Sequence, residues 1–104
     1  MLPTSSIKVW RDSNLSTNPQ PIDPTHVDSN GNHVGYPCYR LQVLTGVNNS
    51  GEVRVWDQSE SPGMYAPLGA GRTLELYVNN TNLIKLSGSA ASQEAAVVIE
   101  RKEA

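Results

Sequence analysis

A chain of 104 residues has the length of a single domain, here residues 1–104, and can bury one modest hydrophobic core. Only 17% of the residues are charged and the net charge is −2, which excludes the basic surface that binds nucleic acids or anionic membranes. The single cysteine excludes an internal disulfide framework and a metal site built from several thiolates.

The first predicted strand covers residues 6–11. Ile7 and Val9 share one face of this segment, and Lys8 and Trp10 share the other. Such a period of two is typical of a β-strand.

Polar segments flank this strand. Residues 1–6 are expected to form a short tail, because they lack the charged region and the apolar run of an export signal. Residues 12–24 are rich in Asn and Ser, and Pro19, Pro21 and Pro24 each remove a backbone donor. This stretch is therefore predicted to be an extended arm or loop. No later apolar run is long enough to span a membrane.

A small β-ribbon is predicted over residues 25–34. Asn30 and Gly31 form its turn, because both residue types tolerate a positive φ. His26 and His33 could oppose each other across that turn. Two imidazoles and one nearby carboxylate do not complete a metal site, so we expect ordinary turn histidines and no bound metal.

Further strands follow at a spacing of about ten residues and are joined by turn-rich loops. A long connection is expected over residues 58–71 and a loop over residues 88–94, with one helical turn over residues 90–96 as the alternative. This pattern predicts an all-β domain, a single antiparallel β-sandwich or small barrel that is jelly-roll-like, with a Pro/Asn-rich N-terminal arm. The strands are expected at residues 38–45, 52–57, 73–78, 83–86 and 95–100.

The alternation within two of these strands predicts which side chains face inward. Tyr39, Leu41 and Val43 share one face of the segment 38–45. Val53 and Val55 are expected to point into the core, with the intervening Arg and Trp outward or partly covered.

Catalysis is not supported by the residues present. Carboxylates are scattered over loops and outward strand faces, and a Cys38–His33 pair would lack an acidic partner and an oxyanion donor. Cys38 is better explained as a small apolar core residue. Gly69 and Gly71 precede a strand rather than a helix, so they form no phosphate-binding loop. We expect neither enzymatic activity nor a cofactor.

Two tryptophans follow the same local pattern of aliphatic, basic and Val residues, at 7–10 and at 53–56. Trp10 and Trp56 could form an aromatic platform that stacks on a sugar. The interpretation we favour is that each ring is buried at an edge of the core, with its N–H hydrogen-bonded.

About half of the chain resembles small virion proteins of tailed bacteriophages. In those proteins a strand is followed by the pattern Pro-Leu-x-x-Gly-x-x-hydrophobic-x-hydrophobic, and then by a polar turn ending in Asn-Leu. The matching segments here are residues 53–57 (VRVWD), 66–76 (APLGAGRTLEL) and 78–84 (VNNTNLI). The opening at residues 7–12 (IKVWRD), followed by a Pro-rich stretch, also suits such proteins.

The resemblance implies a non-enzymatic capsid decoration or cement protein that binds the major capsid protein and stabilises the head. Such a protein is made in the host cytoplasm, resides on the capsid surface of the virion, and commonly forms a homo-oligomer, here a trimer or dimer. A head-fibre or tail accessory protein is an alternative. Arg and aromatic residues dominate interface energies, so the candidate partner-binding residues are Trp10, Arg11, Trp56, Met64 and Tyr65.

Segments of the chain expected to contact a partner are residues 2–6, 12–24 and 61–67. The competing function is a carbohydrate-binding β-sandwich module, either for host recognition or lectin-like. In that module Trp10, Trp56 or Tyr65 would form the stacking platform.

Overall fold

The computed structural model describes residues 4–58 and 64–103. Within these residues the backbone forms strands joined by turns, together with one short 3-10 helix, and no helix is long and apolar enough to cross a membrane. The elements are β1 (Thr4–Asp12), β2 (Gln20–Pro21), β3 (Cys38–Thr45), β4 (Val53–Asp57), β5 (Tyr65–Leu68), β6 (Thr73–Leu76), η1 (Thr81–Leu83), β7 (Ile84–Gly88) and β8 (Ala95–Glu103).

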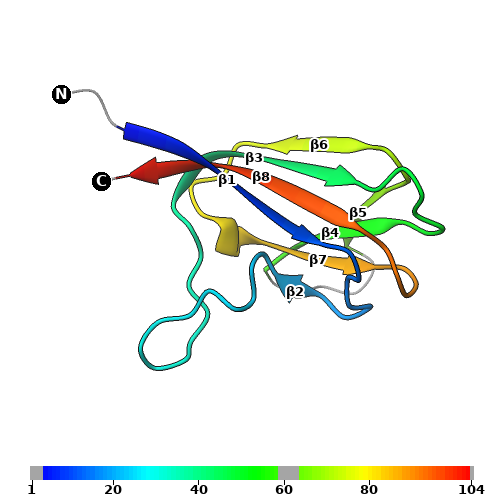
Figure 1. Ribbon diagram of the computed structural model, residues 1–104, viewed down its shortest axis with the longest axis horizontal. Coiled ribbons are helices and arrows are strands. Elements are labelled where there is room, and N and C mark those ends of the chain that lie inside the picture. Colours follow the sequence, from blue (N-terminus) through cyan, green and yellow to red (C-terminus); the bar gives the residue numbers. More distant parts are fainter. Residues whose placement is uncertain (1–3, 59–63, 104) are drawn as a thin grey trace.

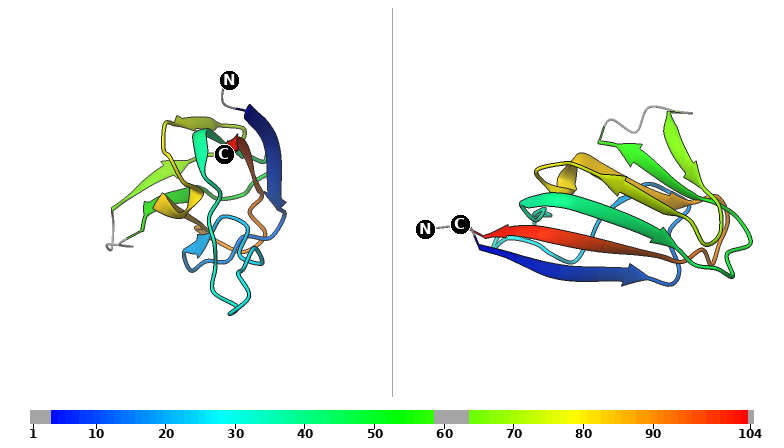
Figure 2. Two further views of the ribbon diagram at one scale, coloured as in Figure 1. Left: turned by 90° about the vertical axis from the view of Figure 1, so that its left-hand side faces the viewer. Right: turned by 90° about the horizontal axis from the view of Figure 1, so that it is seen from above.

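Two four-stranded antiparallel sheets pack face to face (Figures 1 and 2). One sheet, called sheet A below, has the order β1-β8-β3-β6, and sheet B has the order β2-β7-β4-β5. The pairs β1–β8, β2–β7, β3–β6 and β4–β5 are nested, as in one long hairpin rolled up on itself. This connectivity is the eight-stranded jelly roll. The predicted all-β sandwich is confirmed.

The core lies between the two sheets and follows the period of two along each strand. Leu41 and Val43 of β3 are fully buried, whereas the residues that alternate with them, Arg40, Gln42 and Leu44, are only partly covered. Val53 and Val55 point inward from the opposite sheet, as predicted. The remaining buried apolar side chains are Leu15, Ile22, Tyr36, Cys38, Ile84, Leu86, Ala95, Val97 and Ile99.

The segment 12–24 is a loop, but it is not a free arm, and this corrects the expectation from its composition. Leu15 is 1% exposed and Ile22 is 0% exposed, so both belong to the core. The Leu15 N–H donates to the Gln93 carbonyl at 2.9 Å, and β2, which lies within residues 12–24, pairs with β7. The two aliphatic residues in an otherwise polar segment hold the loop against the sandwich.

A β-bulge corrects the predicted face of Tyr39. The register between β3 and β8 shifts between Cys38 and Arg40, so Cys38 and Leu41 both point inward. Tyr39 is left 37% exposed. One extra residue in a strand reverses the alternation at that point.

Two other expectations are altered by the structure, and a third is confirmed. The stretch 58–71 contains β5, which pairs with β4 and was not predicted; the turn expected at residues 61–63 lies outside the described residues. The loop expected at residues 88–94 is confirmed from Ser89 onward, and the helical alternative over residues 90–96 is not formed. The expected N-terminal tail is already part of β1 from Thr4 onward, and residues 1–3 lie outside the described range.

The ribbon predicted over residues 25–34 is confirmed as a small hairpin that projects from the body (Figure 1). Val27 and His33 form a β-bridge, and Gly31 adopts φ +80°. The Asp28 carboxylate accepts the Asn30 N–H at 2.8 Å, which stabilises the turn.

Replacing Leu15 by Ala is expected to lower the free energy of unfolding by about 2–5 kcal/mol, because the side chain is fully buried. Val47→Ala is the control; Val47 is 78% exposed, and its loss should cost less than about 0.5 kcal/mol. Urea denaturation of both variants measures the difference. Equal stabilities would show that the loop does not belong to the core.

Candidate functional site

The five residues predicted to bind a partner lie on two different sheets. Trp10 and Arg11 belong to β1 at the edge of sheet A, whereas Trp56 lies on β4 of sheet B. Met64 immediately precedes β5, and Tyr65 begins it. The structure therefore brings Trp56 and Tyr65 together on sheet B, with Met64 next to Tyr65 in sequence, and leaves Trp10 and Arg11 on the other sheet.

Three side chains on the outer face of sheet B form a compact cluster. The rings of Trp56 and Tyr65 lie directly opposite each other on β4 and β5, with centroids 4.8 Å apart. The Arg54 guanidinium carbon lies 4.5 Å from the centroid of the Tyr65 ring. Met64, beside them in sequence, is 68% exposed. We call Arg54, Trp56 and Tyr65 the aromatic patch.

The Trp56 ring is anchored on its own sheet. It is half-buried, and its Nε1–H donates to the Ser87 hydroxyl at 2.8 Å. The ring lies on the outer face of sheet B, however, and not at the edge of the core that the sequence predicts. Its plane is inclined by 48° to that of Tyr65. The two rings are therefore not coplanar and do not form a flat stacking surface for a sugar.

Arg54 combines attractive contacts with an unsatisfied donor. Its Nη2 lies 3.4 Å from the Glu52 carboxylate, and both side chains are 31% exposed. Its Nε is buried and has no hydrogen-bond partner among the described residues. A buried donor without a partner costs free energy.

On β1 the larger ring faces the core and the smaller aliphatic residues face solvent. Trp10 packs against the buried cluster and pairs with Val97. Ile7 is 63% exposed and Val9 is 59% exposed, on the outer face of sheet A. Arg11, on that same face, forms an ion pair with Glu94 at 2.8 Å. Trp10 and Trp56 thus belong to separate surfaces.

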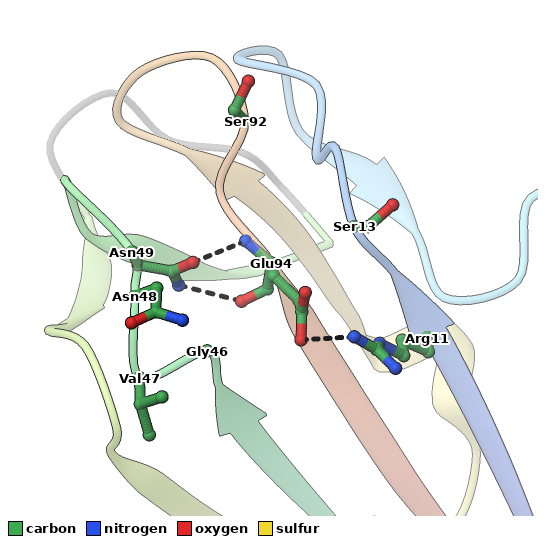
Figure 3. Close-up of a pocket in the computed structure, with 8 residues that line it drawn as sticks. All are labelled: Arg11, Ser13, Gly46, Val47, Asn48, Asn49, Ser92 and Glu94. Carbon is green, nitrogen blue, oxygen red and sulfur yellow. Dashed lines mark hydrogen bonds and ion pairs between the residues drawn. The ribbon is translucent and has the colours of Figure 1, made fainter.

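A polar hollow of about 260 Å³ lies at the end of the sandwich away from the termini (Figure 3). The loops that follow β1, β3 and β7 form its wall. The Arg11–Glu94 ion pair crosses it, and Asn49 binds both backbone groups of Glu94, at 2.8 and 2.9 Å. Its lining residues are Arg11, Ser13, Gly46, Val47, Asn48, Asn49, Ser92 and Glu94.

A buried glutamine, which sequence reasoning missed, holds these loops together. Gln93 is 0% exposed, and its amide oxygen accepts the Gly51 N–H at 2.8 Å. Its amide nitrogen donates to the Ser50 hydroxyl and to the Ala91 carbonyl. A Gln within a polar stretch carries no local signal of burial; only the meeting of three loops explains its position.

The two histidines serve the packing of the hairpin rather than a metal site. The His26 ring stacks on Tyr36, with centroids 4.1 Å apart, and its Nδ1–H donates to the Val34 carbonyl at 2.6 Å. His33 Nε2 lies 3.1 Å from the Ile22 carbonyl. In residues 4–58 and 64–103 no three His, Cys, Asp or Glu side chains gather as metal ligands would.

Tyr36 is the anchor between the hairpin and the sandwich. Its hydroxyl donates to the Asp23 carboxylate at 2.6 Å. The Lys8 ammonium and the Arg101 guanidinium lie 5.5 and 5.4 Å from its ring centroid. Burial, followed by the hydrogen bond to Asp23, raises the pKa of Tyr36 to about 12.

Cys38 is a core residue, as predicted. It is 0% exposed, and its thiol donates to the Val78 carbonyl at 3.2 Å. Burial raises the pKa of the Cys38 thiol, which keeps it protonated and weakly nucleophilic at neutral pH.

Gln93→Ala is expected to destabilise the protein by about 2–4 kcal/mol, because it removes three hydrogen bonds and leaves the Gly51 N–H without its acceptor. Gln58→Ala removes the same side chain at an exposed turn and should change stability by less than about 0.5 kcal/mol. Chemical denaturation compares the two variants. A loss below about 0.5 kcal/mol for Gln93→Ala would contradict its structural role.

The raised pKa of Tyr36 predicts a loss of stability at alkaline pH. Because the folded state holds this proton more tightly than the unfolded state, whose pKa is near 10.0, its contribution is complete below pH 10 and is lost toward pH 12. Tyr36→Phe lacks this proton. The difference in unfolding free energy between wild type and variant should therefore be constant up to about pH 10 and then shrink. A difference that stays constant to pH 12 would disprove the assignment.

The chain matches no known protein-family model, and no curated protein or solved structure is significantly similar to it. A proposal for its function therefore depends on the surfaces described above and on the resemblance of its strand-and-turn segments to phage virion proteins.

Proposed function

We propose that this chain is a non-enzymatic structural protein of a tailed-phage virion, a capsid decoration protein that attaches to the major capsid protein through the aromatic patch. The observation that carries the proposal is the gathering of Arg54, Trp56 and Tyr65 on the outer face of one sheet, next to the exposed Met64 in sequence. Trp, Tyr, Arg and Met are the residue types enriched where proteins bind proteins.

The chemistry of the patch suits a protein partner better than a sugar. The two tilted rings present their edges instead of one flat surface, and the Arg54 guanidinium beside them adds a positive charge. Met64, which is exposed and next to Tyr65 in sequence, is flexible and polarizable, and such side chains adapt to the shape of a partner.

Of the segments that resemble phage virion proteins, residues 53–57 include Arg54 and Trp56 of the patch, whereas residues 69–84 form turns and strands of the fold. Gly71 adopts φ +67° in the turn before β6, where the Thr45 hydroxyl accepts the Arg72 N–H at 2.8 Å. Asn80 caps η1 by accepting the Asn82 N–H at 3.0 Å. These contacts explain the Pro-Leu-x-x-Gly and Asn-Leu patterns physically. The virion role itself is supported by the resemblance.

Binding in many copies to one shell would make a small patch sufficient. Each contact can be weak, because neighbouring copies on the same particle raise the effective concentration of every other contact. A rigid sandwich with loops fixed by buried polar contacts loses little conformational entropy when it attaches.

The polar hollow favours one second candidate, a lectin-like role. It is lined by amide and hydroxyl side chains that include Ser13, Asn48 and Ser92. Groups of this kind hydrogen-bond sugars, and jelly rolls also occur as lectin domains. Specific glycan binding that Asn48→Ala abolishes would favour this role over attachment to a capsid.

The proposal predicts that Tyr65→Ala lowers the affinity for heads lacking this protein by at least tenfold. Such a change corresponds to a loss of about 1.4 kcal/mol of binding free energy, which is typical when an important interface residue is truncated. Tyr77→Ala is the matched control, because Tyr77 is 77% exposed and follows β6 of sheet A, outside the patch. Occupancy on purified heads, measured by quantitative gel analysis and electron microscopy, gives the result. Equal occupancy of the two folded variants would exclude the aromatic patch as the docking surface.

A further inference from the structure

We propose that two copies of this chain associate through β1, which pairs antiparallel with its own copy and joins the two A sheets into one continuous eight-stranded sheet. The two-fold axis passes beside Val9. This association concerns the free protein and is independent of the proposed attachment to a capsid, which uses the opposite sheet.

The first argument comes from a comparison of the four sheet edges. β2 has two residues and contains Pro21, and β5 has four residues and contains Pro67. β6 has only four residues. Short length and proline are devices that keep sheet edges from pairing.

β1 differs from the other three edges. It has nine residues, contains no proline, and pairs with β8 without any shift of register. Among the described residues no strand lies beyond it, and both views in Figure 2 place it at the margin of the molecule. A long, regular edge is a template for another strand.

The second argument is the outer face of β1. Ile7 and Val9 are 63% and 59% exposed, although Ile and Val are the residues that gain most from a neighbouring strand. Val98 lies opposite Val9 on β8 and is only half-buried, so the apolar strip continues across the sheet at this position. Glu100 lies opposite Ile7. A strand added at the edge would cover the exposed flank of this strip.

Self-pairing is possible in a register without like charges directly opposite each other. If Lys8 faced its own copy, two ammonium groups would meet, which is unfavourable. A shift of two residues places Val9 opposite Val9 of the second copy and Ile7 opposite Arg11, whose aliphatic stem can cover it. Lys8 then lies opposite Trp10.

The inner face of β1 is compatible with this register. The Lys8 ammonium is already drawn toward Tyr36, 5.5 Å from the ring centroid, so it does not project across the open edge. Trp10 is partly exposed beside the core, and the opposing Lys8 of a second copy would place a cation at an aromatic ring.

Sedimentation or light scattering of the full chain tests the association directly. The wild type should show a mass of twice 11.3 kDa that dissociates on dilution. Val9→Lys places two cations opposite each other and should raise the dissociation constant at least about tenfold. Val47→Lys introduces the same charge at a loop residue that is 78% exposed and should leave the dimer intact.

Cross-linking tests the register. Cα atoms directly opposite in an antiparallel pair lie about 4.5–5.5 Å apart, within the range of a disulfide. Val9→Cys should therefore form a covalent dimer on mild oxidation, because native Cys38 is buried. Ile7→Cys should not, since the two copies of residue 7 would be about 13 Å apart.

Three results would overturn the proposal. A wild type that is monomeric at high concentration would exclude the association and would leave β1 free for a strand of another protein. A dimer that tolerates Val9→Lys as well as Val47→Lys would place the interface elsewhere. Faster cross-linking of Ile7→Cys than of Val9→Cys would exclude the register.

Discussion

The pairing of β8 with two neighbours is the interaction on which the rest of the fold depends. β8 lies between β1 and β3, and its inward residues Ala95, Val97 and Ile99 are all 0% exposed. β8 is the last of the described strands, so its pairing with β1 joins the two ends of the long hairpin, and its pairing with β3 forms where that hairpin rolls up. The jelly roll is therefore built from contacts between residues that are distant in sequence. The edge position of β1 follows from that order of strands.

Buried polar side chains hold the loops in place through hydrogen bonds, as buried aliphatic side chains hold the strands through packing. Gln93 and Asn49 satisfy backbone groups of segments about 45 residues apart, which a hydrophobic contact could not do. Tyr36 anchors the projecting hairpin through its hydroxyl and its ring. These contacts let a chain with only 17% charged residues carry long polar loops in a defined shape. A defined shape reduces the entropy lost on binding.

The two outer faces of the sandwich divide the proposed interactions between them. Sheet B carries the tilted Trp56–Tyr65 pair and the Arg54 guanidinium, which suit a protein surface. Sheet A carries the apolar strip that begins at Ile7 and Val9 on an unprotected edge. Because the faces are separate, a copy joined to a second copy through β1 keeps its aromatic patch accessible. A paired protein would then present two patches, and two weak attachments would reinforce each other.

Local sequence determined the class of fold and the inward residues of the regular strands. The alternation in residues such as Leu41, Val43, Val53 and Val55 depends only on the two-residue period of an extended backbone. The turn at Asn30-Gly31 was also predictable from local sequence, because the positive φ that Gly31 adopts there is favoured by the residue type itself.

Only the tertiary structure decided which apolar residues are covered. In β1 it turned Trp10 inward and left Ile7 and Val9 in solvent, since the sheet order makes this strand an edge. It buried Leu15 in a loop whose polarity predicted an arm, and it separated Trp10 from Trp56, which share one local pattern. Burial is fixed by contacts with segments far along the chain, and no window of neighbouring residues contains them.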